Sequence, residues 1–285
     1  CTDDLFQSCK RQYVDILQDF GASERFLLDG GALVLHSLEN PLLGWDCGGQ
    51  FLQLVYIVER FLRDIKHRGG VFDVFFMLEN SAVFGSLGAS HQLAREAVLR
   101  HLVECEGKTS IKVHLVMDSW ILQRRGANEI QKIWASNRFS KDAFVEWQTM
   151  IETVNPAFMM TDLAGGKNVA ALSSGIFVHQ CLSEGLWTVL IGDHAFTGSR
   201  ILAWIIKPIL RMETQRSTKQ KISRVRNDAE SLLLKAPSVD LNVQSEFANF
   251  NLVTVALQNF FCRSARTDLE VKLAAVFCVT KCLMR

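Results

Sequence analysis

The chain has 285 residues, a formal net charge of +1 and 48% hydrophobic residues, which is ordinary for one large globular domain. A net charge near zero excludes recruitment of nucleic acid or anionic membrane by a field of the whole molecule, so any basic surface must be local. No apolar stretch approaches the roughly 20 residues of a membrane span, and the start resembles no signal peptide. These two absences predict a soluble, cytoplasmic protein without membrane contact. The first residue is Cys1 rather than Met, and we therefore expect a fragment of a longer protein.

Apolar runs and helical patterns alternate along the chain, and this predicts a parallel sheet with right-handed crossovers and helices on both faces. The fold class is therefore α/β, Rossmann-like, with about five strands. The predicted strands are 25–34, 71–78, 111–117, a short run from Ala157, and 187–191. The predicted helices are an N-terminal one before Gly21, 50–67, 91–106 with Ser90 as its cap, a pattern after Ser140, 168–184, and one that begins over 198–206.

The same patterns divide the chain into four parts. We expect an N-terminal helical segment at 1–24, the α/β domain at 25–208, a basic segment at 209–236, and a helical extension at 237–285 that packs on the same domain. The basic segment is either a solvated linker or an arm that contacts phosphates. Its cations are Arg211, Arg216, Lys219, Lys221, Arg224 and Arg226.

Four apolar runs end on an aspartate, namely Asp29, Asp118, Asp162 and Asp193. Ligands gather beyond the carboxyl ends of parallel strands, and clustered carboxylates suit Mg²⁺ or Mn²⁺, which can activate water for phosphodiester cleavage. We group Asp29, Asp162 and Asp193 as candidate metal ligands and add Glu59, from the first crossover helix, as a fourth catalytic acid. Asp118 cannot be placed from spacing. The alternative is that these aspartates only cap helices and initiate turns.

Other motifs are incomplete. The run GGKN at 165–168 lacks the first Gly and the Ser or Thr of a phosphate-binding loop, so no ATP site is expected. The eight cysteines contain no CxxC pair, which indicates reduced, buried thiols rather than disulfides or a zinc site. His194 is either a general acid beside Asp193 or a histidine in a surface turn.

Several segments resemble a known family. SERFLLDG at 23–30, GQFL at 49–52, YIVERFL at 56–62, GGVFDVFF at 69–76 and VFCVT at 276–280 are similar to the N-terminal region of the large antiviral, superkiller-like DExD/H-box RNA helicases. This resemblance implies a PIN-like domain, a small Rossmann-like fold whose active members cut RNA with Mg²⁺ or Mn²⁺ held by acids at strand ends. It matches Asp29, Glu59 and Asp162 to those acids, with Asp193 as an optional one.

One position departs from the family. The helicase relatives tend to carry DGD where this chain has DGG at 29–31, so an expected carboxylate is replaced by Gly31. Three hypotheses follow. The chain is an RNA-binding PIN-like module with a weak or degenerate metal site, a Mg²⁺- or Mn²⁺-dependent ribonuclease, or a protein-interaction module that docks on the downstream helicase domains or on a partner.

Overall fold

The computed structural model describes residues 11–20, 24–40, 43, 51–78, 80–117, 143–162 and 169–208. All of these residues belong to one compact unit. The expected helical extension at 237–285, the basic segment at 209–236 and the first ten residues lie outside the described residues.

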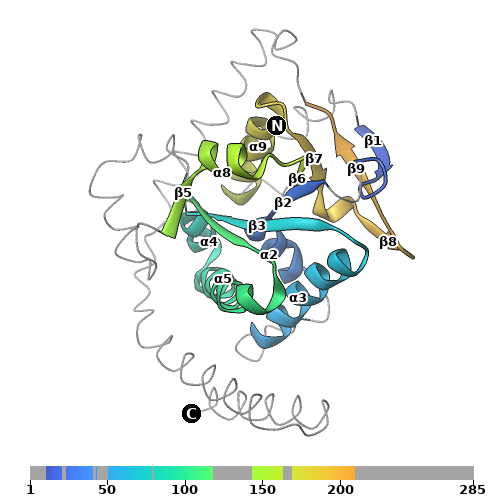
Figure 1. Ribbon diagram of the computed structural model, residues 1–285. Helices are drawn as coiled ribbons and strands as arrows, with labels where there is room; N and C mark the ends of the chain where they lie inside the picture. The colour runs from blue at the N-terminus through green and yellow to red at the C-terminus, as the bar shows by residue number, and fades with distance from the viewer. Residues whose placement is uncertain are drawn as a thin grey trace, which may run out of the picture. The chain divides into compact units, whose positions relative to one another are not determined.

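Within the described residues, nine strands form one sheet in the order β1-β9-β7-β6-β2-β3-β4-β5, with β8 paired to β9 (Figure 1). The six strands from β7 to β5 run parallel, whereas β9 is antiparallel to β7, β1 and β8. The strands are β1 (Arg11–Asp15), β2 (Arg25–Asp29), β3 (Val71–Met77), β4 (Val113–Met117), β5 (Phe144–Glu146), β6 (Phe158–Thr161), β7 (Trp187–Leu190), β8 (Ala195–Thr197) and β9 (Arg200–Ile206).

Helices cover both faces of the sheet, as the sequence predicts. Figure 1 shows α8 and α9 on one side of the sheet and α2, α3 and α5 on the other. The helices are α2 (Gly30–Leu38), α3 (Phe51–His67), α4 (Asn80–Leu87), α5 (Ala89–Thr109), α8 (Trp147–Val154) and α9 (Val169–Ser183), with a short 3₁₀ helix, η2 (Ile191–Asp193). Among the described helices, none combines the length and the apolar character needed to cross a bilayer.

The central strands are apolar at successive positions because both of their faces are covered. On the face of α8 and α9, Leu27 and Phe75 of the sheet pack with Trp147 and Cys181 of these helices. The preceding residue of β2, Phe26, points to the other face of the sheet. There its ring stacks on Phe158 of β6, with ring centroids 4.5 Å apart. The predicted strands of the central sheet are all present, as β2, β3, β4, β6 and β7.

The expected N-terminal helix is wrong at residues 11–15, which form β1. The helical spacing of Tyr13, Ile16, Leu17 and Phe20 suggested a helix, but Tyr13 belongs to the strand, and Ile16 and Leu17 are buried in the turn after it. β1 exists because it pairs antiparallel with β9, 190 residues away along the chain, with Tyr13 opposite Trp204. A partner so distant in sequence leaves no local signal.

The helix expected over 198–206 is also wrong, since this segment is β9. A short apolar run buried on both faces cannot be told from a buried helix by periodicity alone. Gly198, with φ of +58°, and Ser199 form the two-residue turn of the β8–β9 hairpin, and Thr197 pairs with Arg200 across it. A Gly-Ser pair between two such runs is a hairpin signal that favours the strand.

Two helix boundaries differ from the expectation. The first strand stops at Asp29 rather than at residue 34, and α2 begins immediately after it. The N-cap of α5 is Gly88 and not Ser90, and α4 precedes it as a separate helix. α2 starts after its N-cap Asp29, and its first residue is a glycine because the Phe76 ring occupies the space where a Cβ atom of residue 30 would lie.

Candidate acidic pocket at the carboxyl edge of the sheet

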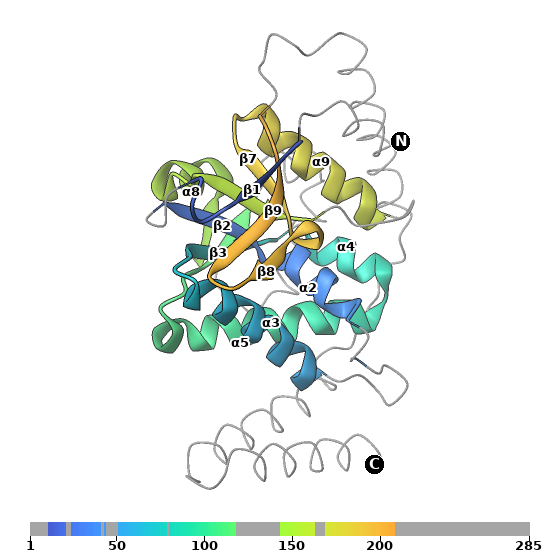
Figure 2. The same ribbon diagram turned by 90° about the vertical axis from the view of Figure 1, so that its right-hand side faces the viewer.

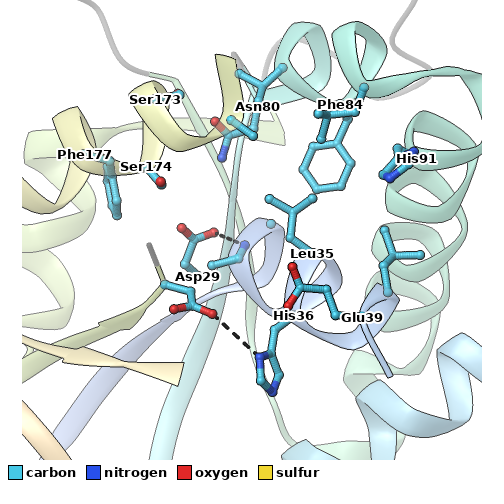
Figure 3. A pocket seen from close by; sticks show the side chains of 17 residues that line it. Asp29, Leu35, His36, Glu39, Asn80, Phe84, His91, Ser173, Ser174 and Phe177 are labelled. Atoms are coloured by element: carbon cyan, nitrogen blue, oxygen red, sulfur yellow. Dashed lines mark hydrogen bonds and ion pairs between the residues drawn. The ribbon is translucent and has the colours of Figure 1, made fainter. Parts of the chain in front are cut away.

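A cavity of about 360 Å³ opens beyond the carboxyl ends of β2 and β6 (Figure 3). Its walls come from α2, α4, α9 and the first turn of α5, and two predicted acids, Asp29 and Asp162, lie in it together. The described residues that line it are Asp29, Gly31, Ala32, Leu35, His36, Leu38, Glu39, Asn80, Val83, Phe84, Leu87, His91, Asp162, Ala170, Ser173, Ser174 and Phe177.

Asp29 is a buried carboxylate with two protein donors. It is the N-cap of α2, where Oδ1 accepts a hydrogen bond from the Ala32 amide at 3.1 Å. Oδ2 accepts from the Thr161 hydroxyl on the neighbouring strand β6 at 2.9 Å. Burial raises the pKa of Asp29, and these two hydrogen bonds offset part of that rise because they favour the charged form. Asp29 therefore joins the start of α2 to the end of β6.

Asp162 follows β6 and is less buried than Asp29. Its Oδ2 atom lies 3.7 Å from Nδ1 of His36, which projects from α2, as the dashed line to His36 in Figure 3 shows. On another side, the Gly192 backbone of η2 approaches the Asp162 carboxylate, since a Cβ atom on Gly192 would lie 3.5 Å from both carboxylate oxygens. Asp193, the next residue, ends η2, but its side chain lies outside the described part of the structure.

Gly31 lines the same cavity, at the position where the resemblance to the helicase family predicts an acid. A Cβ atom at this position would lie 3.2 Å from Oδ1 of Asp29 and 3.1 Å from Nδ2 of Asn80. A carboxylate at position 31 would therefore stand beside Asp29. Glycine leaves this corner of the cavity without the second charge.

Glu59 lies outside the described lining of this cavity. It projects from the middle of α3, and its Oε1 atom is 2.9 Å from Nε2 of His101 on α5. That hydrogen bond is the main reason why the pKa of Glu59 is lowered, although partial burial opposes the shift. The Cys105 thiol lies 3.7 Å from the same His101 nitrogen. The structure thus joins Asp29 with Asp162 and places Glu59 in a separate cluster.

Asp118 and the six cations Arg211, Arg216, Lys219, Lys221, Arg224 and Arg226 lie outside the described residues. His194 is described, and it packs edge-on against Phe61 and Phe196 with ring centroids 5.0 and 4.7 Å away. Burial in this aromatic setting lowers the pKa of His194, so the neutral imidazole is favoured more strongly than it would be in water.

Among the described residues, Asp29 and Asp162 are the two predicted ligands for Mg²⁺ or Mn²⁺ that line the cavity. Such ions take several oxygen ligands, most often from carboxylates. Here Asp29 already accepts two hydrogen bonds, Asp162 faces His36, and the other acid in the lining, Glu39, is exposed at the end of α2. Among the described residues, three metal-ligating side chains converge only at Glu59, His101 and Cys105.

Sequence reasoning missed the polar groups that surround the two aspartates. His36 lies two helical turns after Asp29, and this spacing would have pointed to it if α2 had been recognised as a helix. Asn80, His91, Ser173 and Ser174 come from three other helices. They meet only through tertiary packing, so no local signal could have found them.

A mostly parallel sheet with helices on both faces and acids beyond adjacent strand ends is an α/β architecture consistent with a PIN-like domain. The family model of the PIN-like domain of the ATP-dependent RNA helicase DDX60 matches residues 5–247. The chain belongs to this family, which confirms the resemblance seen in the sequence.

Relatives are distant. A human protein described as a probable ATP-dependent RNA helicase, DDX60-like, is 22% identical over 277 residues, which are 96% of this chain and 14% of that protein. The chain thus spans about one seventh of the length of the curated relative that it matches. No solved structure matches the chain.

Proposed function

We propose that this chain is the RNA-binding PIN-like module of a DDX60-type helicase, and that its acidic pocket does not support metal-dependent cleavage. The family match and the description of the relative as an RNA helicase support the first part. The observation that carries the second part is the environment of Asp29, which is buried and has Gly31 rather than an acid beside it.

A catalytic metal needs carboxylates that are charged and free to coordinate it. Burial favours the neutral form of Asp29, and Gly31 supplies no second acid beside it. Asp29 therefore acts as a structural link between α2 and β6, and Asp162 with His36 is left as a polar pair in the cavity.

A different surface is suited to RNA. Tyr13 of β1 and Trp204 of β9 stand opposite each other on the sheet, and they are 48% and 43% exposed, with ring centroids 5.2 Å apart. A single exposed aromatic side chain is ordinary, but two exposed rings in contact form an apolar patch, and such patches favour binding surfaces. Figure 2 shows β1 and β9 side by side on the face turned toward the viewer.

Two arginines flank this aromatic pair. Alternation along the strands puts Arg11 on the same face as Tyr13, and Arg200 on the same face as Trp204. Arg200 is largely exposed, with a long 3.9 Å contact from its Nε to Asp15. Exposed aromatic rings that stack bases, beside cations that meet phosphates, are the usual elements of a single-strand binding surface.

RNA titration with the whole 285-residue chain tests the proposal. We expect fluorescent single-stranded RNA to bind more tightly at low than at high salt, because phosphate contacts release counterions. Trp204→Ala should weaken binding by about 1–3 kcal/mol, or roughly 5- to 150-fold in Kd, the scale of one lost stacking contact. The matched control is Tyr56→Ala on α3, which removes another exposed ring and should leave Kd unchanged.

Three results would count against this surface or against RNA binding. Equal losses in the Trp204 and Tyr56 variants would show a non-specific effect of removing exposed aromatic area. Full affinity in the Trp204 variant would assign the binding to another part of the chain, for which the basic segment at 209–236 is the first candidate. No salt-dependent binding at all would leave docking on a protein partner as the better hypothesis.

The alternative of an active ribonuclease is tested separately. Labelled RNA incubated with the chain and Mn²⁺ should stay intact. Cleavage that disappears in both Asp29→Asn and Asp162→Asn would overturn the part of the proposal that concerns the pocket and would leave RNA binding untouched. Cleavage that persists in both variants indicates a contaminating nuclease. Asp193→Asn belongs in the same series, because Asp193 follows Gly192, whose backbone approaches the Asp162 carboxylate.

A further inference from the structure

Three metal-ligating side chains meet between α3 and α5, away from the acidic pocket. His101 and Cys105 are four residues apart on α5, so both project from one face of that helix. α3 packs against α5, and Glu59 reaches across from α3 to the same place. Neither the family nor the proposed RNA surface accounts for this combination.

The donor atoms are close to the spacing of a tetrahedral metal site. Their separations are 2.9 Å from His101 Nε2 to Glu59 Oε1 and 3.7 Å from the same nitrogen to Cys105 Sγ. All three donor atoms lie within 4.8 Å of one another. With metal bonds of about 2.0–2.3 Å, ligand atoms in a tetrahedral zinc site stand roughly 3.5 Å apart. The nitrogen and sulfur already have this separation, and the nitrogen and carboxylate oxygen need to part by about half an ångström.

The chemistry of the three donors selects the ion. A thiolate, a neutral imidazole and a carboxylate are the ligands that Zn²⁺ takes in proteins, whereas Mg²⁺ and Mn²⁺ prefer oxygen alone. The negative charges of the thiolate and the carboxylate balance the two positive charges of zinc. The other oxygen of Glu59 lies 3.8 Å from Nη2 of Arg63, one turn further along α3, which turns Oε1 toward His101.

The cluster is also open to an ion. The Glu59 and His101 side chains are each 28% exposed, and Cys105 is half-buried. A partly exposed site lets the ion enter and leaves its fourth position to water, as in zinc sites with three protein ligands. The ordinary alternative is a hydrogen bond between Glu59 and His101 with a thiol nearby, which needs no ion.

We propose that Glu59, His101 and Cys105 form a zinc-binding site that ties α3 to α5. In this site the metal replaces the hydrogen bond between Glu59 and His101. The Nε2 proton of His101 is released to solvent, the neutral imidazole keeps its proton on Nδ1, and the Cys105 thiol also loses its proton to solvent on coordination. The three residues thereby hold together the two long helices on one face of the sheet. This inference is independent of RNA binding and of the acidic pocket.

Metal uptake by the whole chain tests the proposal. In a reducing buffer, competition with a chromophoric chelator should show one Zn²⁺ bound per chain. Cys105→Ser and His101→Asn should each weaken uptake by more than about 10-fold, the lower limit found even for partners that only support a ligand. Co²⁺ used as a probe should give a thiolate-to-metal charge-transfer band that Cys105→Ser abolishes and that Glu59→Gln retains at higher Co²⁺ concentration.

Matched controls separate the site from the other cysteines and histidines of the chain. Glu104→Gln changes the exposed acid next to Cys105, and His67→Asn changes an exposed histidine at the end of α3. Both should bind Zn²⁺ like the wild type. Zn²⁺ should also raise the urea midpoint of the wild type and of both controls, but not that of Cys105→Ser, because only the folded state holds the complete site.

Some results of these measurements would overturn the zinc site at Glu59, His101 and Cys105. Uptake that is unchanged in both Cys105→Ser and His101→Asn, or no uptake at micromolar Zn²⁺, overturns the proposal. If Cys105→Ser fails to fold, His101→Asn and Glu59→Gln carry the test, since both positions are partly exposed. A Co²⁺ spectrum without a thiolate band that depends on Cys105 also overturns it.

Discussion

Replacement of Asp29 tests the structural role that the buried carboxylate has at the junction of α2 and β6. In Asp29→Ala, the Ala32 amide loses its cap, which costs about 0.5–2 kcal/mol. The buried Thr161 hydroxyl loses its acceptor, which costs about 1–3 kcal/mol. Relief from burying a charge offsets part of this sum, since burial disfavours charged Asp29. We therefore expect a net loss of about 2 kcal/mol in the free energy of unfolding.

Urea unfolding, followed by tryptophan fluorescence and far-ultraviolet circular dichroism, measures this loss. Thr161→Val, which keeps the shape of Thr161 but removes the donor, should cost about 1–2 kcal/mol. In the double variant the two losses should be less than additive, because both single changes remove the same hydrogen bond.

The dependence on pH has a definite sign. The folded pKa of Asp29 is raised above the ordinary value of 3.8, so the folded state holds this proton more tightly than the unfolded state. The contribution of Asp29 to stability is then greatest below pH 3.8, and it falls as the pH rises through the folded pKa. Asn cannot ionise, so the free energy of unfolding of Asp29→Asn should be lower relative to that of the wild type at acid pH than at pH 8.

Two results would refute this reasoning about Asp29. One is an Asp29→Ala variant within about 0.5 kcal/mol of the wild type, which is the range of an ordinary surface substitution. The other is a wild-type advantage over Asp29→Asn that grows toward high pH. That result would identify charged Asp29 as the stabilised form and would restore it as a metal-ligand candidate.

Two further predictions concern the surroundings of the pocket. Gly30→Ala should destabilise the chain by about 1–3 kcal/mol because the new methyl group meets the Phe76 ring. Gly107→Ala on α5 has open space around it and should stabilise the chain by about 0.5–1 kcal/mol. Equal urea midpoints for the two variants would contradict this difference in packing. Burial lowers the pKa of His91 below 6.5, so its contribution to stability is complete above pH 6.5 and is lost as the pH falls through that value toward the folded pKa. His91→Gln should reduce the loss of stability between pH 7.5 and 5.5, and an unchanged loss would show that His91 titrates as it does in the unfolded chain.

Much of the central sheet was predictable from local sequence. The strands β2, β3, β4, β6 and β7 are apolar at successive positions because both faces are covered, and this leaves a direct signal in the chain. The helix α3 was predictable for a similar reason, since its buried residues recur with helical spacing. The family was also recognisable, because its motifs lie in these same segments.

The antiparallel edge of the sheet was not predictable in this way. β1 and β9 each carry apolar residues that suit a helix as well as a strand, and only their pairing decides the outcome. That pairing also places Tyr13 beside Trp204. The RNA surface proposed here is therefore a product of tertiary structure and has no counterpart in a local motif.

The candidate sites divide in the same way. The sequence alone determined that Asp29 and Asp162 follow buried strands, because the length of an apolar run and the residue that ends it are local properties. Only the tertiary structure decided that these two acids share a cavity with His36, and that Glu59 lies instead with His101 and Cys105. The physical reason is that strand order and helix packing set which side chains meet, and both depend on contacts between residues far apart in the chain.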